Sequence, residues 1–238
     1  MNPSALNMTP AAMATDPGVG YPSPLENGDR LTRAEFERRY ALMPQVKKAE
    51  LIEGVVYMPS PVSLVRHAEP HAQIMVWLGT FVAATPGVHF GDNATVRLDL
   101  DNEPQPDAVL FWSAGQGGQA RISDDGYVEG APEFVAEVAA SSVSIDLHAK
   151  RRVYRRSAVQ EYLVWRVQDH AIDWFALHEG DYQPLVVDAV GILRSTHFPG
   201  LWLDAAALLR GDLAAVLQTL QRGVQARAEI VAECSSET

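Results

Sequence analysis

The chain of 238 residues is 47% hydrophobic and 21% charged, which predicts one folded domain with a sizeable core. It contains no run of about 18 apolar residues and no basic-then-apolar leader, so we expect a cytoplasmic protein with no membrane span and no secretion signal. The net charge of −11 argues against nucleic-acid binding through a broad basic face, and the single cysteine, Cys234, argues against a disulfide framework or a zinc site.

The N-terminal part of the sequence begins with residues 1–28, which are rich in Pro, Ala, Met, Ser and Gly. They show no hydrophobic period, so we expect a disordered leader. Thr32 and Glu35 then form a capping-box pattern, which predicts a helix, and Glu53-Gly54 separates two apolar runs, which predicts a hairpin. The expected elements here are a helix over 32–43, strands over 49–52 and 55–58, and a helix over 71–83.

The rest of the chain alternates between apolar β-rich runs and helical patterns. We expect strands at 88–91, 95–100, 107–112, 134–139 and 161–167, a hairpin of 172–177 with 182–187, helices over 144–157 and 212–231, and an exposed excursion at 113–131. Strands mixed with helices predict an α/β or α+β fold, in which a mixed sheet is flanked by helices.

Two acidic residues and a lysine stand out against this pattern. Asp107 follows a proline at the start of one predicted strand, Glu137 interrupts a later apolar strand, and Lys150 follows on the next predicted helix. Two carboxylates that hold a divalent metal, with a lysine that neutralises charge or helps position water, are the minimum set for metal-assisted phosphodiester cleavage. The common alternatives are a turn residue for Asp107 and a solvent-facing side chain for Glu137.

Lys150 gives the strongest of the three indications. On a regular helix it projects with Leu147, Val153 and Tyr154, on the apolar side. Lysine is almost never buried without a partner, so a carboxylate site explains this position better than a side chain that reaches the helix edge. Asp146, one turn earlier, is placed to orient it. The other side of the helix is a solvated basic face rather than a substrate clamp, made of Arg151, Arg152, Arg155 and Arg156.

Glu50 and His71 are weaker candidates for the same site. Glu50 lies in the predicted hairpin, where a surface pair with Lys47 or Lys48 is the more common outcome. His71 begins a predicted helix, where a capping or core role is more common, and His67 competes with it. The histidine spacings form no metal trio, and the sequence has no glycine-rich phosphate loop and no nucleophile elbow.

Several stretches of the sequence occur in an order typical of one known family. They are Glu50-Leu51-Ile52-Glu53-Gly54, His71-Ala72-Gln73-Ile74, Pro106-Asp107-Ala108-Val109, Glu137-Val138-Ala139-Ala140-Ser141-Ser142, Asp146 with Lys150 and Tyr154, and Glu161-Tyr162-Leu163-Val164-Trp165. In this order they resemble the Uma2 family (DUF820) of the PD-(D/E)XK nuclease superfamily. We therefore take 29–210 as a nuclease domain and 211–238 as a C-terminal helix with a polar tail.

The resemblance implies a restriction-endonuclease-like mixed sheet flanked by helices, DNA as the substrate, and Mg²⁺ (or Mn²⁺) bound by Asp107 and Glu137. It also implies that Glu50 and His71 lie at the rim of the same cleft or just behind the residues that hold the ion. The superfamily pattern has a lysine two residues after the glutamate, where this chain has Ala139. Lys150 would then deliver the ammonium group from the following helix.

These observations leave three interpretations, led by a magnesium-dependent DNA endonuclease. Ala139 and the acidic net charge favour a second, a catalytically inactive nuclease fold kept as a binding or interaction module. The third is a metal-dependent hydrolase of a smaller phosphoester. Because cleavage of both DNA strands needs two sites, we also expect a homodimer. Phe198, Leu201 and Trp202 are either its interface or a cap over the open end of the core.

Overall fold

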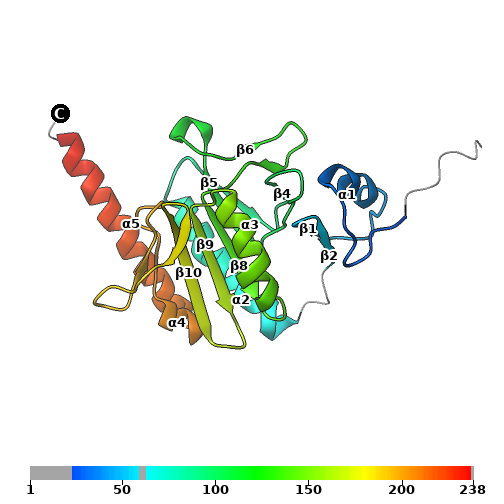
Figure 1. The fold of residues 1–238 in the computed structure, drawn as a ribbon. Helices are drawn as coiled ribbons and strands as arrows, with labels where there is room; N and C mark the ends of the chain where they lie inside the picture. Colours follow the sequence, from blue (N-terminus) through cyan, green and yellow to red (C-terminus); the bar gives the residue numbers. More distant parts are fainter. Residues whose placement is uncertain (1–22, 59–62, 237–238) are drawn as a thin grey trace, which may run out of the picture.

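The computed structural model of the chain describes residues 23–58 and 63–236. Its central sheet is made of β3 (Val88–Asp92), β5 (Ala108–Trp112), β8 (Phe134–Ala139), β9 (Glu161–Arg166), β10 (Ala171–His178) and β11 (Asp181–Pro184). These six strands lie in the order β11-β10-β9-β8-β5-β3 (Figure 1). The pair β8–β9 is parallel and the other neighbours are antiparallel, so the predicted mixed sheet is confirmed.

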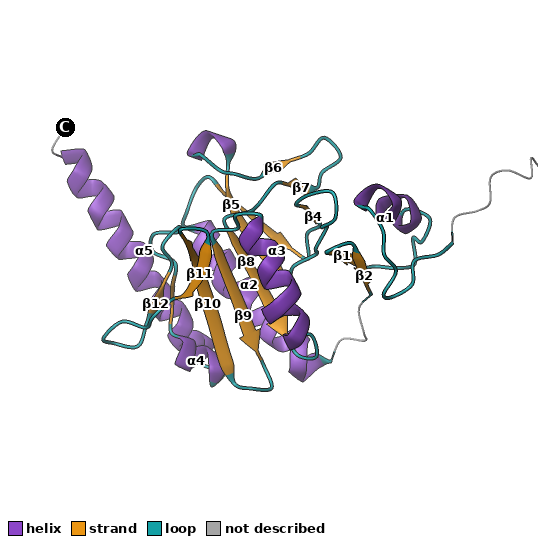
Figure 2. Cartoon of the chain, viewed as in Figure 1, coloured by secondary structure: helices purple, strands orange, loops and turns teal. Residues whose placement is uncertain are grey.

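Helices cover both faces of this sheet (Figure 2). The π-helical turn η3 (Ile145–Lys150) and α3 (Arg151–Arg156) connect β8 to β9 and lie on one face. The other face is covered by α2 (Glu69–Ala83), α4 (Ala205–Leu209) and the first half of α5 (Leu213–Ser236). Because helices cover both faces of the sheet, the side chains on both faces of β8 and β9 are buried, and the sequences of these strands are nearly continuous apolar runs. No helix within the described residues is both long and apolar enough to cross a membrane.

Strand β8 determines which layer its glutamate faces. Phe134, Ala136 and Val138 belong to the core on the α2 side, whereas Val135 and Ala139 belong to the core on the α3 side. Because side chains alternate along a strand, Glu137 points toward α3. The alternation expected from the sequence is therefore confirmed, but the solvent-facing alternative is wrong, since every residue of β8 is buried.

The N-terminal unit consists of α1 (Arg33–Tyr40) and the hairpin of β1 (Glu50–Ile52) with β2 (Val55–Tyr57). Thr32 caps α1 by accepting a hydrogen bond from the backbone N–H of Glu35, as predicted. The turn residues Glu53 and Gly54 have φ values of 53° and 71°, a pairing that favours tight two-residue hairpins. The folded part begins before residue 29, because Leu25 is buried beside this unit; residues 1–22 of the expected leader lie outside the described residues.

The segment between β3 and β8 differs most from the prediction. The strand expected over 95–100 is reduced to β4 (Val96–Arg97), which joins β6 (Arg121–Ile122) and β7 (Val128–Glu129) in a separate small sheet. The excursion at 113–131 is therefore partly structured, with a 3-10 turn, η2 (Ala114–Gln116), near its start and Val128 buried.

The C-terminal part closes the α2 side of the core. The short pair β12 (Leu193–Arg194) and β13 (Trp202–Leu203) precedes α4, and α5 packs on α2 and β13. Phe198 and Leu201 are fully buried, because Phe198 stacks on Trp112 and meets Phe81 edge-on. Phe198 and Leu201 therefore form the cap over the core rather than the exposed dimer surface considered from the sequence, whereas Trp202 is only partly buried.

Candidate active site

The two candidate acids lie side by side at neighbouring strand ends. In the antiparallel pair β5–β8, Ala108 faces Ala136, so one further step of the register sets Asp107 opposite Glu137. Residues directly opposite in an antiparallel pair point to the same face. Asp107 and Glu137 are each 3% exposed, which places both carboxylates in the layer between the sheet and α3.

Lys150 reaches this layer from the facing helix. Its Nζ lies 2.9 Å from Glu137 Oε1, 2.9 Å from Glu50 Oε1 and 3.6 Å from Asp146 Oδ1. The hydroxyl of Tyr154 donates to the same Glu137 oxygen at 3.0 Å. Lys150 is only 4% exposed, so its ammonium group is a buried charge held by carboxylates. We call Glu50, Asp107, Glu137, Asp146 and Lys150 the acid–lysine cluster.

The local backbone explains how the helix delivers Lys150. It is the last residue of the π-helical turn η3, and α3 begins at the next residue. A π-helical turn is wider than an α-helical one and is found frequently at functional sites. A second π-helical turn, η1 (Leu64–Ala68), carries His67 to the same cluster from the start of α2. The sequence predicted a regular helix over 144–157, so the widened turn is a difference from expectation.

Asp107 is fixed by a separate set of contacts. The backbone N–H of Val138 donates to its Oδ2 at 2.7 Å, and Lys48 Nζ lies 3.3 Å from its Oδ1. His67 Nε2 lies 3.6 Å from that same oxygen, while His71 Nε2 lies 3.1 Å from the Asp107 carbonyl. The carboxylate is therefore anchored on one side and faces cationic or titratable groups on the other.

Burial and neighbouring charges raise the pKa of some acids in the cluster and lower that of another. Burial, opposed in part by Lys150, raises the pKa of Glu137 to about 8, and burial also raises the pKa of Asp146. Burial would raise the pKa of Asp107 in the same way. Lys48, His67, the hydrogen bond from the Val138 N–H and Lys150 together outweigh burial and hold this pKa below its usual value. Burial alone would lower the pKa of Lys150, yet its carboxylate partners raise it well above the usual value, as predicted.

The donor set has the chemistry that Mg²⁺ requires. Four carboxyl groups face the ammonium groups of Lys150 and Lys48, and hard oxygen ligands are those Mg²⁺ prefers. One oxygen of Asp146, Oδ1, is buried without a hydrogen bond. Within residues 23–58 and 63–236, no three His, Cys, Asp or Glu side chains are arranged so as to hold a metal as they stand. The carboxyl oxygens are therefore the kind of ligand that Mg²⁺ prefers, and their negative charge would balance that of the ion. The Lys150 ammonium group lies among them.

The structure brings together all six residues that the sequence singled out. Glu50 is buried in the cluster rather than paired at the surface. Its Oε1 accepts a hydrogen bond from the backbone N–H of Gln105 at 2.8 Å, in addition to its contact with Lys150. His71 lies at the rim, where its Nε2 is also 3.1 Å from Asp92 Oδ1. Sequence reasoning missed Lys48 as a partner of Asp107. Its only signal was its place two residues before Glu50, which had suggested a pair with that glutamate instead.

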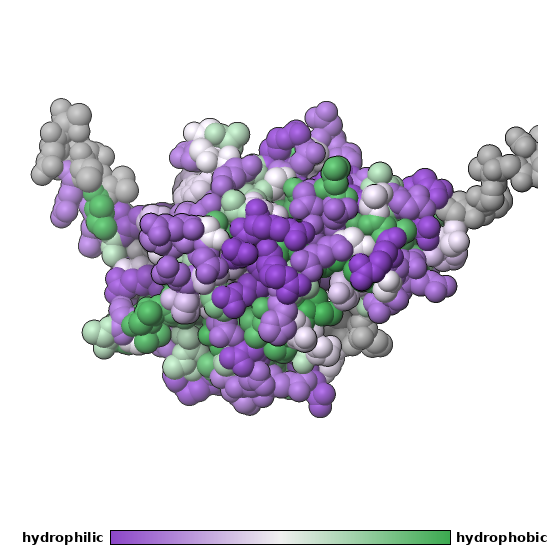
Figure 3. Space-filling model, in the orientation of Figure 1, coloured by the Kyte–Doolittle hydropathy of each residue, from purple (hydrophilic) through white to green (hydrophobic). Residues whose placement is uncertain are grey.

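The basic side of α3 faces away from the cluster, as predicted, but Arg151 is half-buried over the Phe175 ring rather than solvated. Figure 3 shows hydrophilic side chains gathered over this helix. Arg152 and Arg156 are exposed and pair with Glu53 of the hairpin turn at 2.8 and 3.2 Å, and Arg155 donates to the Gly180 carbonyl. These contacts tie the N-terminal unit and the β10–β11 turn to α3, and so help to hold Lys150 in place.

Comparison with known proteins identifies the family and the fold. The model of the Uma2 family, described as "Putative restriction endonuclease", matches residues 33–206. A solved structure described as a putative nuclease belonging to DUF820, from Anabaena variabilis, shares the fold with a TM-score of 0.57 and 13% identity, over 73% of this chain and 96% of that chain. No curated protein matches. Since the family match covers most of the folded chain and all the residues of the acid–lysine cluster, the chain belongs to the Uma2 family.

Proposed function

We propose that this protein is a Mg²⁺-dependent (or Mn²⁺-dependent) DNA endonuclease in which Asp107 and Glu137 hold the ion. The observation that carries the proposal is the buried Lys150 ammonium, bonded to Glu137 and Glu50 beside the Asp107 strand end. When bound, the divalent ion would polarise a phosphate oxygen and lower the pKa of a water molecule. A nuclease family and a cluster of acids with one lysine support this chemistry together.

The chain's own residues have distinct parts in this proposal. Lys150 stabilises the negative charge that develops on the phosphate, from a dry layer where such a charge acts strongly. Glu50 holds the Lys150 ammonium group in position, and the Tyr154 hydroxyl holds the Glu137 carboxyl group in position. The hydrogen bond from Val138 fixes Asp107 before substrate arrives, so little reorganisation is needed.

Lys150 also explains the departure at Ala139. Residues 137 and 139 lie on the same face of β8, which is packed against α3. An ammonium group on residue 139 and one on the facing helix would therefore enter the same layer. Ala139 is fully buried and leaves that space to the helix. We propose that Lys150 takes the role that the superfamily pattern gives to a lysine two residues after the glutamate.

Cleavage of supercoiled plasmid tests this function. Purified full-length protein with Mg²⁺ or Mn²⁺ should relax and linearise the plasmid, and a chelator should stop it. Glu137→Gln should reduce the rate by about a hundredfold or more, the scale of losing a group that stabilises the transition state. Glu229→Gln is the matched control, because Glu229 is exposed on α5 and outside the acid–lysine cluster. Equal rates for wild type and Glu137→Gln would contradict the proposal.

One observation favours an alternative, a catalytically inactive binding module. Glu137 Oε1 already accepts from both Lys150 and Tyr154, which is what a closed structural network would show. The plasmid assay together with a gel-shift experiment separates the two functions, because an inactive module would bind DNA and leave the plasmid intact with every metal.

We further propose that the active form is a homodimer, because two identical sites related by a two-fold axis suit the two strands of a duplex. Light scattering at micromolar concentration should then give a mass of twice the 26.0 kDa chain. A monomer both with and without DNA would overturn the dimer and leave nicking of one strand as the activity.

A further inference from the structure

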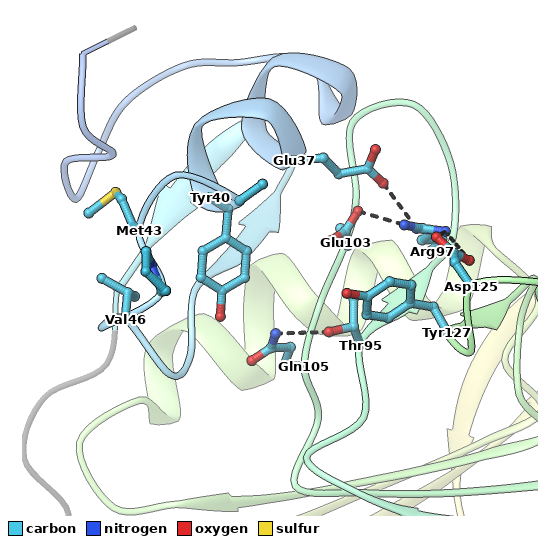
Figure 4. Close-up of a pocket in the computed structure, with 12 residues that line it drawn as sticks. Glu37, Tyr40, Met43, Val46, Thr95, Arg97, Glu103, Gln105, Asp125 and Tyr127 are labelled. Carbon is cyan, nitrogen blue, oxygen red and sulfur yellow. Dashed lines mark hydrogen bonds and ion pairs between the residues drawn. The ribbon is translucent and has the colours of Figure 1, made fainter. Parts of the chain in front are cut away.

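A cavity of about 450 Å³ lies outside the acid–lysine cluster, between the N-terminal unit and the small sheet of β4, β6 and β7. Figure 4 shows Tyr40 and Tyr127 on opposite sides of it, with Gln105 and Thr95 between them at one end. The other end is formed by Arg97 and acidic side chains that point toward it. A volume of this size lies within the range of small-molecule sites.

Polar atoms in this cavity lack hydrogen bonds. Glu103 is 4% exposed, and its Oε2 forms no hydrogen bond with any described residue. The same holds for Glu37 Oε1 and Arg97 Nε, which face each other as an ion pair at 3.0 Å. Buried polar atoms without hydrogen bonds cost free energy, so a ligand that supplies donors to the acids and an acceptor to the arginine would be favoured here.

The charges of the lining exclude two kinds of ligand. Three acids, Glu37, Glu103 and Asp125, surround Arg97, so a phosphate group would be repelled. An organic cation is excluded because the Arg97 guanidinium already occupies the position where such a cation would bind, among these acids and 4.3 Å above the Tyr127 ring. The ligand that fits is uncharged, planar and rich in N–H groups.

The cavity and the acid–lysine cluster share one wall. The backbone of Glu103 exchanges hydrogen bonds with Leu51 of β1, at 2.8 and 3.1 Å. Gln105 points its side chain toward Thr95 in the cavity, while its backbone N–H donates to Glu50 in the cluster. A strand whose phosphate lies at the cluster would therefore pass close to the cavity.

We propose that this cavity takes one unstacked base of the nucleic-acid strand, with bases that carry an exocyclic amino group bound more tightly than thymine. The proposal rests on the proposed nuclease function and adds how its substrate is held. Base rings stack on tyrosine, and enzymes that take up an extruded base read it by stacking and by hydrogen bonds to its edge. An amino base offers N–H donors to the acidic end of the cavity, where Glu37 and Glu103 lie beside Arg97.

Binding of free deoxynucleosides tests this without any need for cleavage. Deoxyadenosine, deoxycytidine, deoxyguanosine and thymidine would each be titrated into the full chain by calorimetry, with spermidine as a cationic probe. We expect the three amino nucleosides to bind at least about fivefold more tightly than thymidine, by analogy with the smallest single-base discriminations. Tyr127→Leu and Tyr40→Leu should each weaken this binding about tenfold, the scale of losing one stacking partner.

Two variants make the result specific. Tyr57→Leu is the matched control, because Tyr57 is a half-buried tyrosine of the same N-terminal unit that does not line the cavity, and it should bind like wild type. Glu103→Gln keeps the shape but replaces a carboxyl oxygen, which can accept a hydrogen bond, by an NH₂ group, which only donates, so it should reduce the preference for amino nucleosides. No nucleoside binding, binding unaffected by either cavity tyrosine, or binding of spermidine in place of nucleosides would overturn the proposal. Nucleoside binding in a protein that cleaves no DNA would uphold the base site and reject the nuclease function.

Discussion

Replacing Lys150 by methionine tests whether its ammonium group balances the buried acids. The substitution keeps most of the side chain's length and apolar contact but leaves Glu137, Glu50 and Asp146 without their shared cation. Breaking a buried charge network by removing one partner costs about 3–5 kcal/mol. For a domain of this size each kcal/mol corresponds to about 2–4 °C, so the melting temperature should fall by about 6–20 °C at neutral pH.

The pH dependence of this loss identifies its cause. The folded-state pKa of Glu137 is already raised from 4.5 to about 8, so the stability that its protonation gives is full below 4.5 and is lost as the pH rises through 8. Without Lys150 the ionised acids repel one another more, and the deficit of the variant relative to wild type should grow between pH 5 and 9. Circular dichroism melts across this range measure it, with Lys47→Met as the exposed control, expected to change the free energy of unfolding by less than about 0.5 kcal/mol. Equal deficits for the two variants, or a deficit independent of pH, would refute the argument.

Three further outcomes follow from the same contacts. Mg²⁺ at about 100 times its dissociation constant should raise the free energy of unfolding by about 2.7 kcal/mol, and a thermal-shift titration should show no such gain for Asp107→Asn. Burial and the neighbouring Glu37 raise the pKa of Glu103 to about 8, so stability should fall as the pH rises from 4.5 through 8, and urea melts of Glu103→Gln should show a flatter pH profile. Phe198→Ala should cost about 3–5 kcal/mol in urea denaturation, whereas Val190→Ala, at a position 74% exposed, should be nearly neutral.

The sequence predicted the acid pair and the lysine for reasons that are local. Alternation along 134–139 gives the face of Glu137, and the helical period of 144–157 gives the face of Lys150, so each side chain can be oriented without knowing its partner. Their meeting required only that the two layers pack, which any sheet flanked by helices provides. This part of the candidate site therefore follows from periodicity and from the family's motifs together.

Other features depended on packing that no local pattern encodes. Glu103 follows Asp99 and Asp101 in a polar stretch whose sequence contains no sign of burial, but pairing of its backbone with Leu51 buries it under the N-terminal unit. Lys48 looked like a partner of Glu50, yet the packing of the hairpin against the start of β5 turns it to Asp107. In both cases the deciding contact joins residues more than fifty positions apart, beyond the reach of a window-based argument.

The ammonium group of the candidate site comes from a helix and not from the sheet, so its position depends on how that helix packs. A lysine at position 139 would be fixed by the sheet that also carries Glu137, whereas Lys150 depends on how η3 and α3 dock on that sheet. The docking is held by Tyr162, whose hydroxyl donates to the Asp146 carbonyl, and by the arginine pairs with Glu53. The hairpin that supplies Glu50 is thus tied to the helix that supplies Lys150 at two points, one buried and one exposed. Movement of the N-terminal unit would therefore disturb the acid–lysine cluster and the wall of the nearby cavity together, which makes this unit an integral part of the nuclease-like core.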